Sequence, residues 1–167
     1  MNDELAYLKE VSVFAALSDE VLTLIGQCAK RVEIEAGKVL FAEGDLANEM
    51  VVVLKGGLEV YKRGRNGLEA RIAVLGPGDV VGEMSLVDIQ PRSADVRAVE
   101  ATSVVTVSHA DIANVYREDP QSYTLMVLNI AREISIRLRR MDNMLANVTT
   151  ELSDVTGTRI DRGVREE

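Results

Sequence analysis

The sequence predicts an α+β fold that is mainly β: an antiparallel β-roll, or jelly-roll barrel, of about eight strands, flanked by N-terminal helices and a long C-terminal helix. Nine of the twelve glycines lie between Gly37 and Gly82, and none lies between Glu83 and Thr156. A turn-rich part therefore precedes a helical part. Within the turn-rich part, short apolar alternations separated by glycines are typical of an antiparallel barrel or sandwich.

Two short helices are expected before the strands. Leu5, Leu8 and Val11 recur at the spacing of one helix face, and the apolar residues at 21–25 follow the segment Ser18-Asp19-Glu20. Serine is a favoured N-cap residue, and the two carboxylates after it lie where the helix dipole favours negative charge. The second helix is therefore expected to begin after Ser18.

The strands are expected in the turn-rich part and shortly after it. Seven short runs of five or six residues are rich in apolar side chains, and most of them are separated by glycine turns such as Gly56-Gly57 and Gly76-Pro77-Gly78. The runs are 31–36, 38–42, 50–54, 58–62, 71–75, 95–99 and 103–107.

After Ser108 the apolar period lengthens to that of a helix. A short helix is expected over 110–117, and Pro120 suits the first turn of a long one. From Val127 onward, apolar or small residues follow one another at alternating gaps of four and three, which is an a/d heptad seam sustained over four heptads. The members of the seam are Val127, Ala131, Ile134, Leu138, Met141, Leu145, Val148, Leu152 and Val155.

Two interpretations of this seam stay open. The stripe either packs on the chain's own barrel or forms a two-helix coiled coil between identical subunits. A stripe of about 28 residues is roughly 42 Å long, which exceeds the width of a small barrel and favours a homodimer through the C-terminal helix. The expected organisation is the N-terminal helices and barrel over 1–119, the long helix over 120–156 and a flexible tail over 157–167.

The composition excludes several classes of function. The 19 basic and 27 acidic residues give a net charge of -8, which argues against a broad surface for nucleic-acid phosphates, so a bound anion needs a local pocket. One cysteine and one histidine are too few for a disulfide, a zinc cluster or a Cys/His catalytic set. The N-terminus lacks a basic region and no run of 18 apolar residues occurs. A cytoplasmic protein without a membrane span is expected.

The strongest candidate site lies just after the turn-rich part. Gly82 frees the chain for an unusual turn, and residues 83–86 are expected to form one short helical turn whose N–H groups point at an anion. Arg92 follows on a loop, ready to give forked hydrogen bonds to a phosphate, and Ser93 adds a hydroxyl donor. On spacing alone, a simple ion pair between Glu83 and Arg92 accounts for these residues equally well.

The segment Gly82-Glu83-Met84-Ser85-Leu86, followed after four residues by Pro91-Arg92-Ser93-Ala94, resembles the phosphate-binding cassette of the cyclic nucleotide-binding domain family. The resemblance extends over roughly residues 12–146. Further segments resemble the family's approach to its first helix, its first barrel turns and its central hairpin: 13–18, 36–37, 43–45 and 54–60.

The resemblance implies a role for each matched residue. It implies that Arg92 binds an equatorial oxygen of the cyclic phosphate and that Glu83 accepts a hydrogen bond from the ribose 2'-hydroxyl. It also implies that main-chain N–H groups around Met84, Ser85 and Ser93 complete the cradle. A cyclic phosphate diester carries one negative charge, so one arginine neutralises it and no metal is expected.

The resemblance also bears on the base. In the family the C-terminal helix usually covers the base, and a rough register makes Met141, Asp142 and Asn143 the expected base contacts. Threonine at the position of Ser93 tends to accompany cGMP, while alanine or serine accompanies cAMP, so cAMP is favoured over cGMP as the ligand.

The sequence thus predicts a stand-alone cyclic nucleotide sensor that signals through its C-terminal helix to a dimer partner or an unidentified protein effector. The alternative is a structural or dimerisation module of the same fold that binds no ligand and serves as a subunit of a larger assembly. No enzyme is expected, because no catalytic constellation is visible. Transcription regulators of this family continue into a helix-turn-helix domain, and only about ten residues follow Gly157, so no DNA binding is expected.

Overall fold

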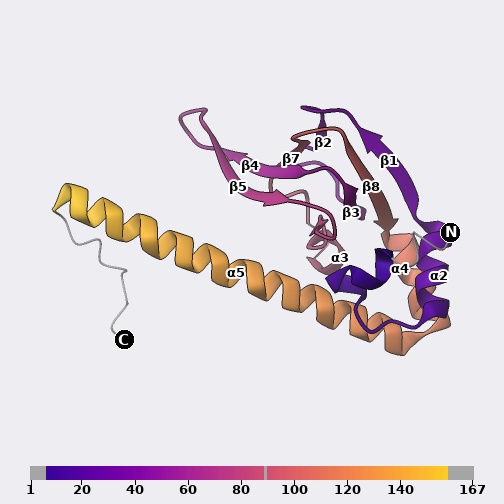
Figure 1. The fold of residues 1–167 in the computed structure, drawn as a ribbon. Coiled ribbons are helices and arrows are strands. Elements are labelled where there is room, and N and C mark those ends of the chain that lie inside the picture. The colour runs from indigo at the N-terminus through magenta and orange to yellow at the C-terminus, as the bar shows by residue number, and fades with distance from the viewer. Residues whose placement is uncertain (1–6, 89, 158–167) are drawn as a thin grey trace, which may run out of the picture. The chain divides into compact units, whose positions relative to one another are not determined.

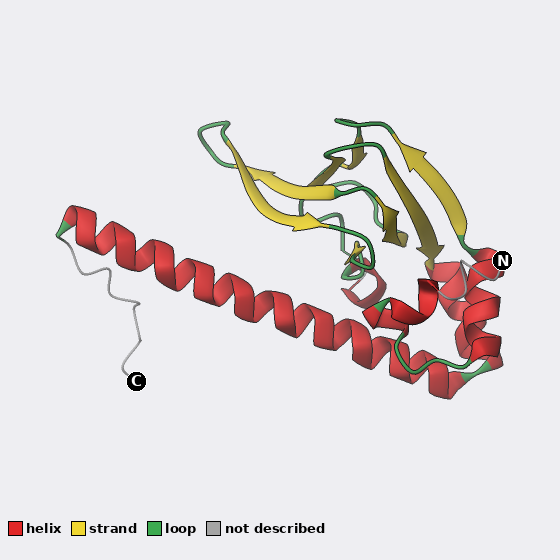
Figure 2. Cartoon of the chain, viewed as in Figure 1, coloured by secondary structure: helices red, strands yellow, loops and turns green. Residues whose placement is uncertain are grey.

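The computed structural model describes residues 7–88 and 90–157, in which two antiparallel four-stranded sheets form the body of the fold (Figure 1, Figure 2). One sheet has the strand order β1-β8-β3-β6 and the other β2-β7-β4-β5. This confirms the predicted, mainly β fold with about eight strands. The strands are β1 (Lys30–Ile34), β2 (Val39–Phe41), β3 (Glu49–Lys55), β4 (Leu58–Arg63), β5 (Glu69–Leu75), β6 (Val80–Val81), β7 (Asp95–Ala98) and β8 (Thr102–Ser108).

Helices precede, interrupt and follow the strands. Residues 7–10 are helical, and Ser18 caps the next α-helix as predicted, because its hydroxyl oxygen accepts a hydrogen bond of 3.3 Å from the Val21 N–H. The long helix begins at Pro120, the expected position. The helical elements are η1 (Ser12–Phe14), α2 (Asp19–Cys28), α3 (Ser85–Asp88), α4 (His109–Glu118) and α5 (Pro120–Thr156).

The sequence-based boundaries needed two corrections. The seven predicted strands are present with ends that differ by at most two residues, but β6 was not predicted, because two residues are too few to show a period. The turn expected over 83–86 is closed by a 3.1 Å hydrogen bond from the Leu86 N–H to the Glu83 carbonyl oxygen, but the helix α3 itself begins two residues later than expected, at Ser85. Both corrections fall next to Gly82, where the backbone changes direction.

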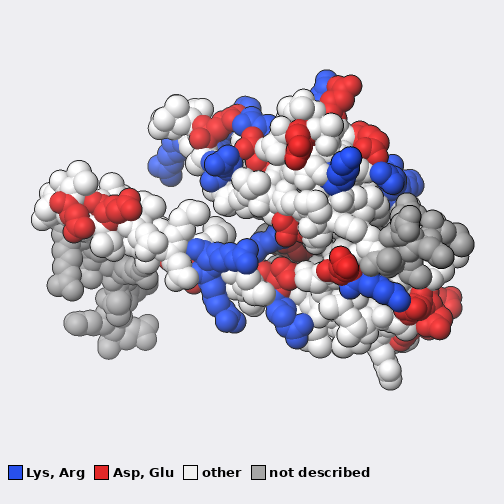
Figure 3. Space-filling model, viewed as in Figure 1, with Lys and Arg blue, Asp and Glu red and all other residues white. Residues whose placement is uncertain are grey.

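The core lies between the two sheets and takes apolar side chains from both. Strand β8 is buried along almost its whole length, and the central strand β3 buries four consecutive residues. Burial of this continuous apolar surface is the main force that holds the sheets together. The core cluster consists of Ile34, Phe41, Val51, Val53, Leu58, Leu75, Val81, Val96, Ala98 and Val104. Outside the core, acidic and basic side chains are interspersed over the visible face (Figure 3).

The chain divides into two compact units, Met1–Ala131 and Arg132–Glu167, and α5 runs through both. In the first unit α5 buries Met126, Asn129 and Ile130, and the Asn129 amide donates a 2.9 Å hydrogen bond to the Ala15 carbonyl oxygen. None of these buried residues belongs to the heptad seam. In the second unit Ile134 is half-buried and the seam residues after it are exposed: Leu138, Met141, Leu145, Val148, Leu152 and Val155 are 45% to 86% exposed.

Asp119 caps the first turn of α5. Its carboxylate accepts hydrogen bonds from the Ser122 hydroxyl at 2.7 Å, from the Ser122 N–H at 3.1 Å and from the Gln121 N–H at 3.0 Å. The bond from the Ser122 hydroxyl is the largest cause of a lowered pKa for Asp119, followed by the bond from the Ser122 N–H. The folded chain therefore favours the ionised carboxylate.

This lowered pKa makes the stability of α5 dependent on pH. A carboxyl whose pKa is lower in the folded chain adds stability above its unfolded pKa, about 3.9, and that stability is lost as the pH falls through the folded value. Asparagine keeps the capping oxygen but does not titrate. We therefore expect the free energy of unfolding to fall less between pH 7 and pH 3 in Asp119→Asn than in the unsubstituted protein. Urea unfolding at both pH values measures this, with the neighbouring Glu118→Gln as control. Equal pH dependence in all three proteins would contradict it.

Candidate functional site

Gly82 turns the chain between β6 and α3. Its φ is +81°, in the left-handed region that favours glycine. A Cβ atom at this position would overlap Nη1 of Arg92 and would lie 3.1 Å from the Glu49 carbonyl oxygen. Glycine is therefore required both by the backbone conformation and by the close approach of the arginine.

The turn after Gly82 is fixed by hydrogen bonds to its own backbone and to α4. The Ser85 hydroxyl donates to the Gly82 carbonyl oxygen at 2.7 Å, and Ser85 is buried. The Ser85 carbonyl oxygen lies 2.9 Å from Nε2 of His109, so this ring nitrogen donates the hydrogen bond. Met84 is 44% exposed. At the start of such a turn the first N–H groups have no partner within the helix, which leaves them directed outward.

Arg92 is a buried cation, with only 7% of its surface exposed. Its N–H donates to the Asp45 carbonyl oxygen, and its carbonyl accepts from the Gly44 N–H, each at 2.9 Å. These bonds tie its loop to the connection between β2 and β3. Nε and Nη1 of its guanidinium are buried and have no hydrogen-bond partner among residues 7–88 and 90–157. The guanidinium carbon lies 3.5 Å from the centroid of the Phe41 ring.

The electrostatic environment of Arg92 suits a single anion. Burial lowers the pKa of Arg92, while the negative charges of Glu49, Asp45 and Glu83 raise it, and an arginine in these surroundings remains charged. Glu83 is 1% exposed. Burying charged donors without partners costs free energy, and an anionic ligand that accepts from them removes that cost. A simple pairing of Glu83 with Arg92 does not account for the two unpartnered nitrogens.

The predicted site residues fall into two groups. The structure brings Gly82, Glu83, Ser85 and Arg92 together, and Ser93 follows Arg92 with an exposed side chain. The expected base contacts, Met141, Asp142 and Asn143, lie on the exposed part of α5 in the second unit, and their role stays a prediction.

Sequence reasoning missed two residues that contact this site. Phe41 lies against the Arg92 guanidinium, and His109 binds the Ser85 carbonyl oxygen. Phe41 ends an apolar run of three residues, which agrees with a buried position but does not indicate what the ring would meet. For His109, its position at the start of a helix gave no indication of a contact 24 residues away.

Other parts of the described chain are weaker candidates for an anion-binding or metal-binding site. An open depression of about 690 Å³ lies along α2 and the turn before α5, but it is lined by Asp19, Glu20, Glu118 and Asp119, which repel an anion. Among residues 7–88 and 90–157, no cluster of three His, Cys, Asp or Glu side chains is arranged to hold a metal ion. No helix in that part of the chain is long and apolar enough to span a membrane.

Comparison with known proteins agrees with this geometry. The family described as "Cyclic nucleotide-binding domain" matches residues 31–119. The Cyclic AMP receptor protein of Thermus thermophilus is 33% identical over 135 residues, which are 81% of this chain and 61% of that protein, so this chain spans about three fifths of that relative.

Solved structures give the same result. The crystal structure of the Thermus thermophilus catabolite activator protein superposes with a TM-score of 0.71 and 32% identity, over 82% of this chain and 62% of that chain. The regulatory domain of Toxoplasma gondii PKA, crystallised with cAMP, superposes with a TM-score of 0.64 and 27% identity, over 68% of this chain and 43% of that chain. This chain belongs to the cyclic nucleotide-binding domain family.

Proposed function

We propose that this protein binds a cyclic nucleotide, with cAMP preferred over cGMP, and acts as a sensor that passes binding on through α5. The observation that carries the proposal is the buried Arg92 beside the left-handed turn at Gly82, because its Nε and Nη1 have no partner in the part of the chain that the structure describes. Two relatives support the ligand class: the Thermus protein is named a cyclic AMP receptor, and the Toxoplasma regulatory domain was crystallised with cAMP.

The proposed contacts match the chemistry of a cyclic phosphate. Arg92 donates to a phosphate oxygen, Glu83 accepts from the ribose 2'-hydroxyl, and the N–H groups of Met84, Ser85 and Ser93 complete the cradle. A cyclic diester has one negative charge, which one arginine balances. A phosphate monoester has a charge of about -1.5 to -2 at pH 7 and would meet the carboxylates around Arg92. We therefore propose a diester ligand, held without a metal.

We propose binding without turnover. The residues at the cassette supply a cation, a hydroxyl acceptor and backbone donors, whereas hydrolysis of a phosphodiester needs an activated nucleophile with its base, or a metal. The proposed preference for cAMP rests on the serine side chain at position 93. The base is proposed to contact Met141, Asp142 and Asn143.

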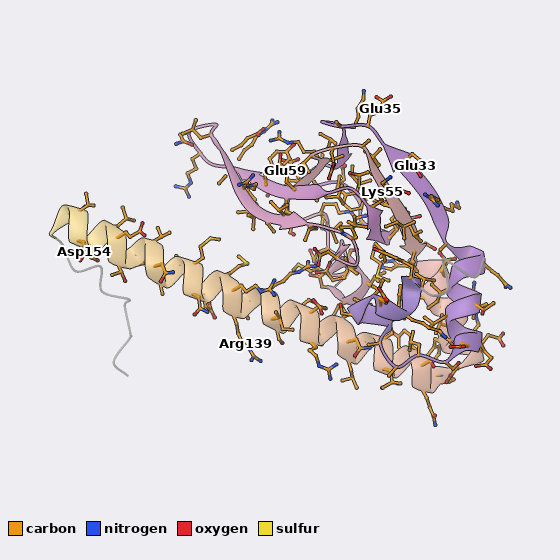
Figure 4. The ribbon with its side chains drawn as sticks, viewed as in Figure 1. Glu33, Glu35, Lys55, Glu59, Arg139 and Asp154 are labelled. Atoms are coloured by element: carbon orange, nitrogen blue, oxygen red, sulfur yellow. The ribbon has the colours of Figure 1, made fainter. Side chains whose placement is uncertain are left out.

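We propose that the signal is transmitted by a homodimer formed through the seam of α5. The seam residues from Leu138 to Val155 are 45% to 86% exposed, and α5 uses other residues to pack in the first unit. An apolar a/d stripe of this length is stabilised when a second helix covers it. Arg139 and Asp154 project from α5 outside the seam (Figure 4), as charged side chains do on the outer face of a coiled coil. A protein effector is the proposed recipient of the change.

A structural module that dimerises without nucleotide is a second candidate. The observation that favours it is that the exposed seam and the cassette lie in different units of the chain, so the seam does not need the ligand in order to pair. A thermal melt distinguishes the two functions, because a ligand that binds only the folded state stabilises it.

The melt is expected to show a clear shift with cAMP. At about 100 times the dissociation constant, a ligand adds roughly 2.7 kcal/mol, which raises the melting temperature by about 5 to 10 °C for a chain of this size. At equal concentration cGMP is expected to give a smaller shift, and 5'-AMP, the matched monoester, none. Calorimetric titration then measures both affinities. The absence of a shift with either cyclic nucleotide at millimolar concentration would refute the sensor function.

A further inference from the structure

Phe41 lies directly against the functional end of Arg92. The ring centroid is 3.5 Å from the guanidinium carbon, and both side chains are 7% exposed, so water does not separate them. A cation over the face of an aromatic ring is attracted by the ring's quadrupole, and the attraction strengthens when both groups are desolvated. The contact joins two residues that are 51 positions apart in the sequence.

This contact holds the arginine in an uncommon way. A buried guanidinium is ordinarily fixed by hydrogen bonds to its edge, but Nε and Nη1 of Arg92 have no such partner among the described residues. Contact with the face of the guanidinium does not use its N–H groups, which all lie in the plane of the group. The ring therefore restrains the cation without engaging either of these two donors.

The backbone holds the ring and the arginine together. Phe41 ends β2 and pairs with Val96 of β7 after a register shift that follows Val39. Immediately beyond Phe41, Gly44 and Asp45 exchange 2.9 Å backbone hydrogen bonds with Arg92. The strand that carries the ring and the loop that carries the cation are thus bonded to each other on both sides of the contact.

We propose that Phe41 is a positioning residue for nucleotide binding, which orients the Arg92 guanidinium by contact with its face and keeps Nε and Nη1 directed at the phosphate of the ligand. The inference rests on the proposed function, because it assigns Phe41 a part in that site. It predicts that the aromatic face of residue 41, beyond its apolar volume, contributes to affinity.

The test compares the chain's two phenylalanines. Phe41→Leu keeps an apolar side chain and removes the ring, and we expect it to weaken cAMP binding about 30-fold, the loss that corresponds to a desolvated cation–π contact. Phe14→Leu is the matched control, because Phe14 is also buried, at 1% exposure, and among residues 7–88 and 90–157 no cation lies over its ring. We expect Phe14→Leu to lower the melting temperature and to leave the affinity within twofold of the unsubstituted protein. Calorimetric titration measures all three proteins.

A spectroscopic readout tests the contact without ligand. Protons of the Arg92 side chain that lie over the Phe41 ring experience its ring current, so we expect their NMR resonances upfield of the usual arginine chemical shifts. In Phe41→Leu we expect the same resonances at the usual arginine chemical shifts. An affinity for Phe41→Leu within twofold of the unsubstituted protein, an equal loss in Phe14→Leu, or ordinary Arg92 resonances in the unsubstituted protein would each overturn the inference. Failure of the unsubstituted protein to bind cAMP or cGMP would instead refute the proposed function on which the inference rests.

Discussion

Arg92→Ala is expected to weaken cAMP binding by about 100-fold or more. A hydrogen bond to a charged group contributes about 1.5 to 3 kcal/mol, so a forked pair to the phosphate contributes at least two orders of magnitude in affinity. Nε and Nη1 of Arg92 are buried and find no partner in the described part of the chain, so they are already desolvated before the ligand arrives. Alanine removes both donors and the positive charge that we propose balances the phosphate.

The ligand-free Arg92→Ala protein is expected to stay folded. Two opposing effects act on its stability: the contact with Phe41 is lost, and the cost of burying the cation is relieved. We expect a change of no more than about 1 kcal/mol in the free energy of unfolding. Arg65→Ala, on the exposed turn between β4 and β5, is the matched control and should bind normally.

Arg92→Lys tests whether the positive charge alone is sufficient for binding. Lysine keeps the positive charge but lacks the planar fork, so we expect an affinity between those of the unsubstituted protein and Arg92→Ala. Calorimetric titration gives the affinities, and urea unfolding shows that each variant is folded. Binding by Arg92→Ala within tenfold of the unsubstituted protein would show that Arg92 does not hold the phosphate.

Much of the fold could be predicted because its signals are local. Glycine turns delimit the strands, the side-chain alternation sets their faces, and Ser18 and Pro120 begin their helices where the sequence places them. The two-residue strand β6 escaped prediction, because it exists only through its pairing with Val51 and Val52 of β3. No pattern within Val80 and Val81 alone distinguishes a strand from a turn.

The candidate site was predictable in its residues but not in its geometry. Gly82 and Arg92 were identified from a contiguous motif, and the structure brings them into contact. The contact of Phe41 with Arg92 depends on the register shift in β2 and on the return of the loop to Gly44 and Asp45. Such contacts arise from tertiary packing, which a single sequence does not show.

The face that α5 buries was also not evident from the sequence. The seam includes Val127 and Ala131. In the first unit, however, α5 buries the residue just before each of these positions, and also a residue midway between them: Met126, Ile130 and Asn129. The amide of Asn129, a polar residue that no apolar pattern selects, bonds to the carbonyl oxygens of η1 and the residue after it. This choice of face leaves the seam available for a second chain.

Leu145→Glu is expected to convert the proposed homodimer to a monomer. Leu145 occupies an a position of the seam and is 60% exposed in the single chain. In a parallel two-helix coiled coil the a residues of both helices face each other, so the substitution places two glutamates together in the interface. The cost of burying unpaired like charges weakens association by about 100-fold or more. Sedimentation equilibrium with and without cAMP measures it.

A control substitution distinguishes an effect on the seam from a general effect of an added charge on α5. Asn147→Glu adds the same charge two residues further on, at a c position that faces away from a coiled-coil partner, and is expected to leave the dimer intact. Both positions are exposed in the single chain, so neither substitution is expected to alter its stability by more than about 0.5 kcal/mol. An unsubstituted protein that is monomeric with and without cAMP, or equal effects of the two substitutions, would refute the proposed dimer. A dimer of equal strength with and without cAMP would favour the structural module over the sensor, because a ligand shifts an equilibrium only by its difference in affinity for the two states.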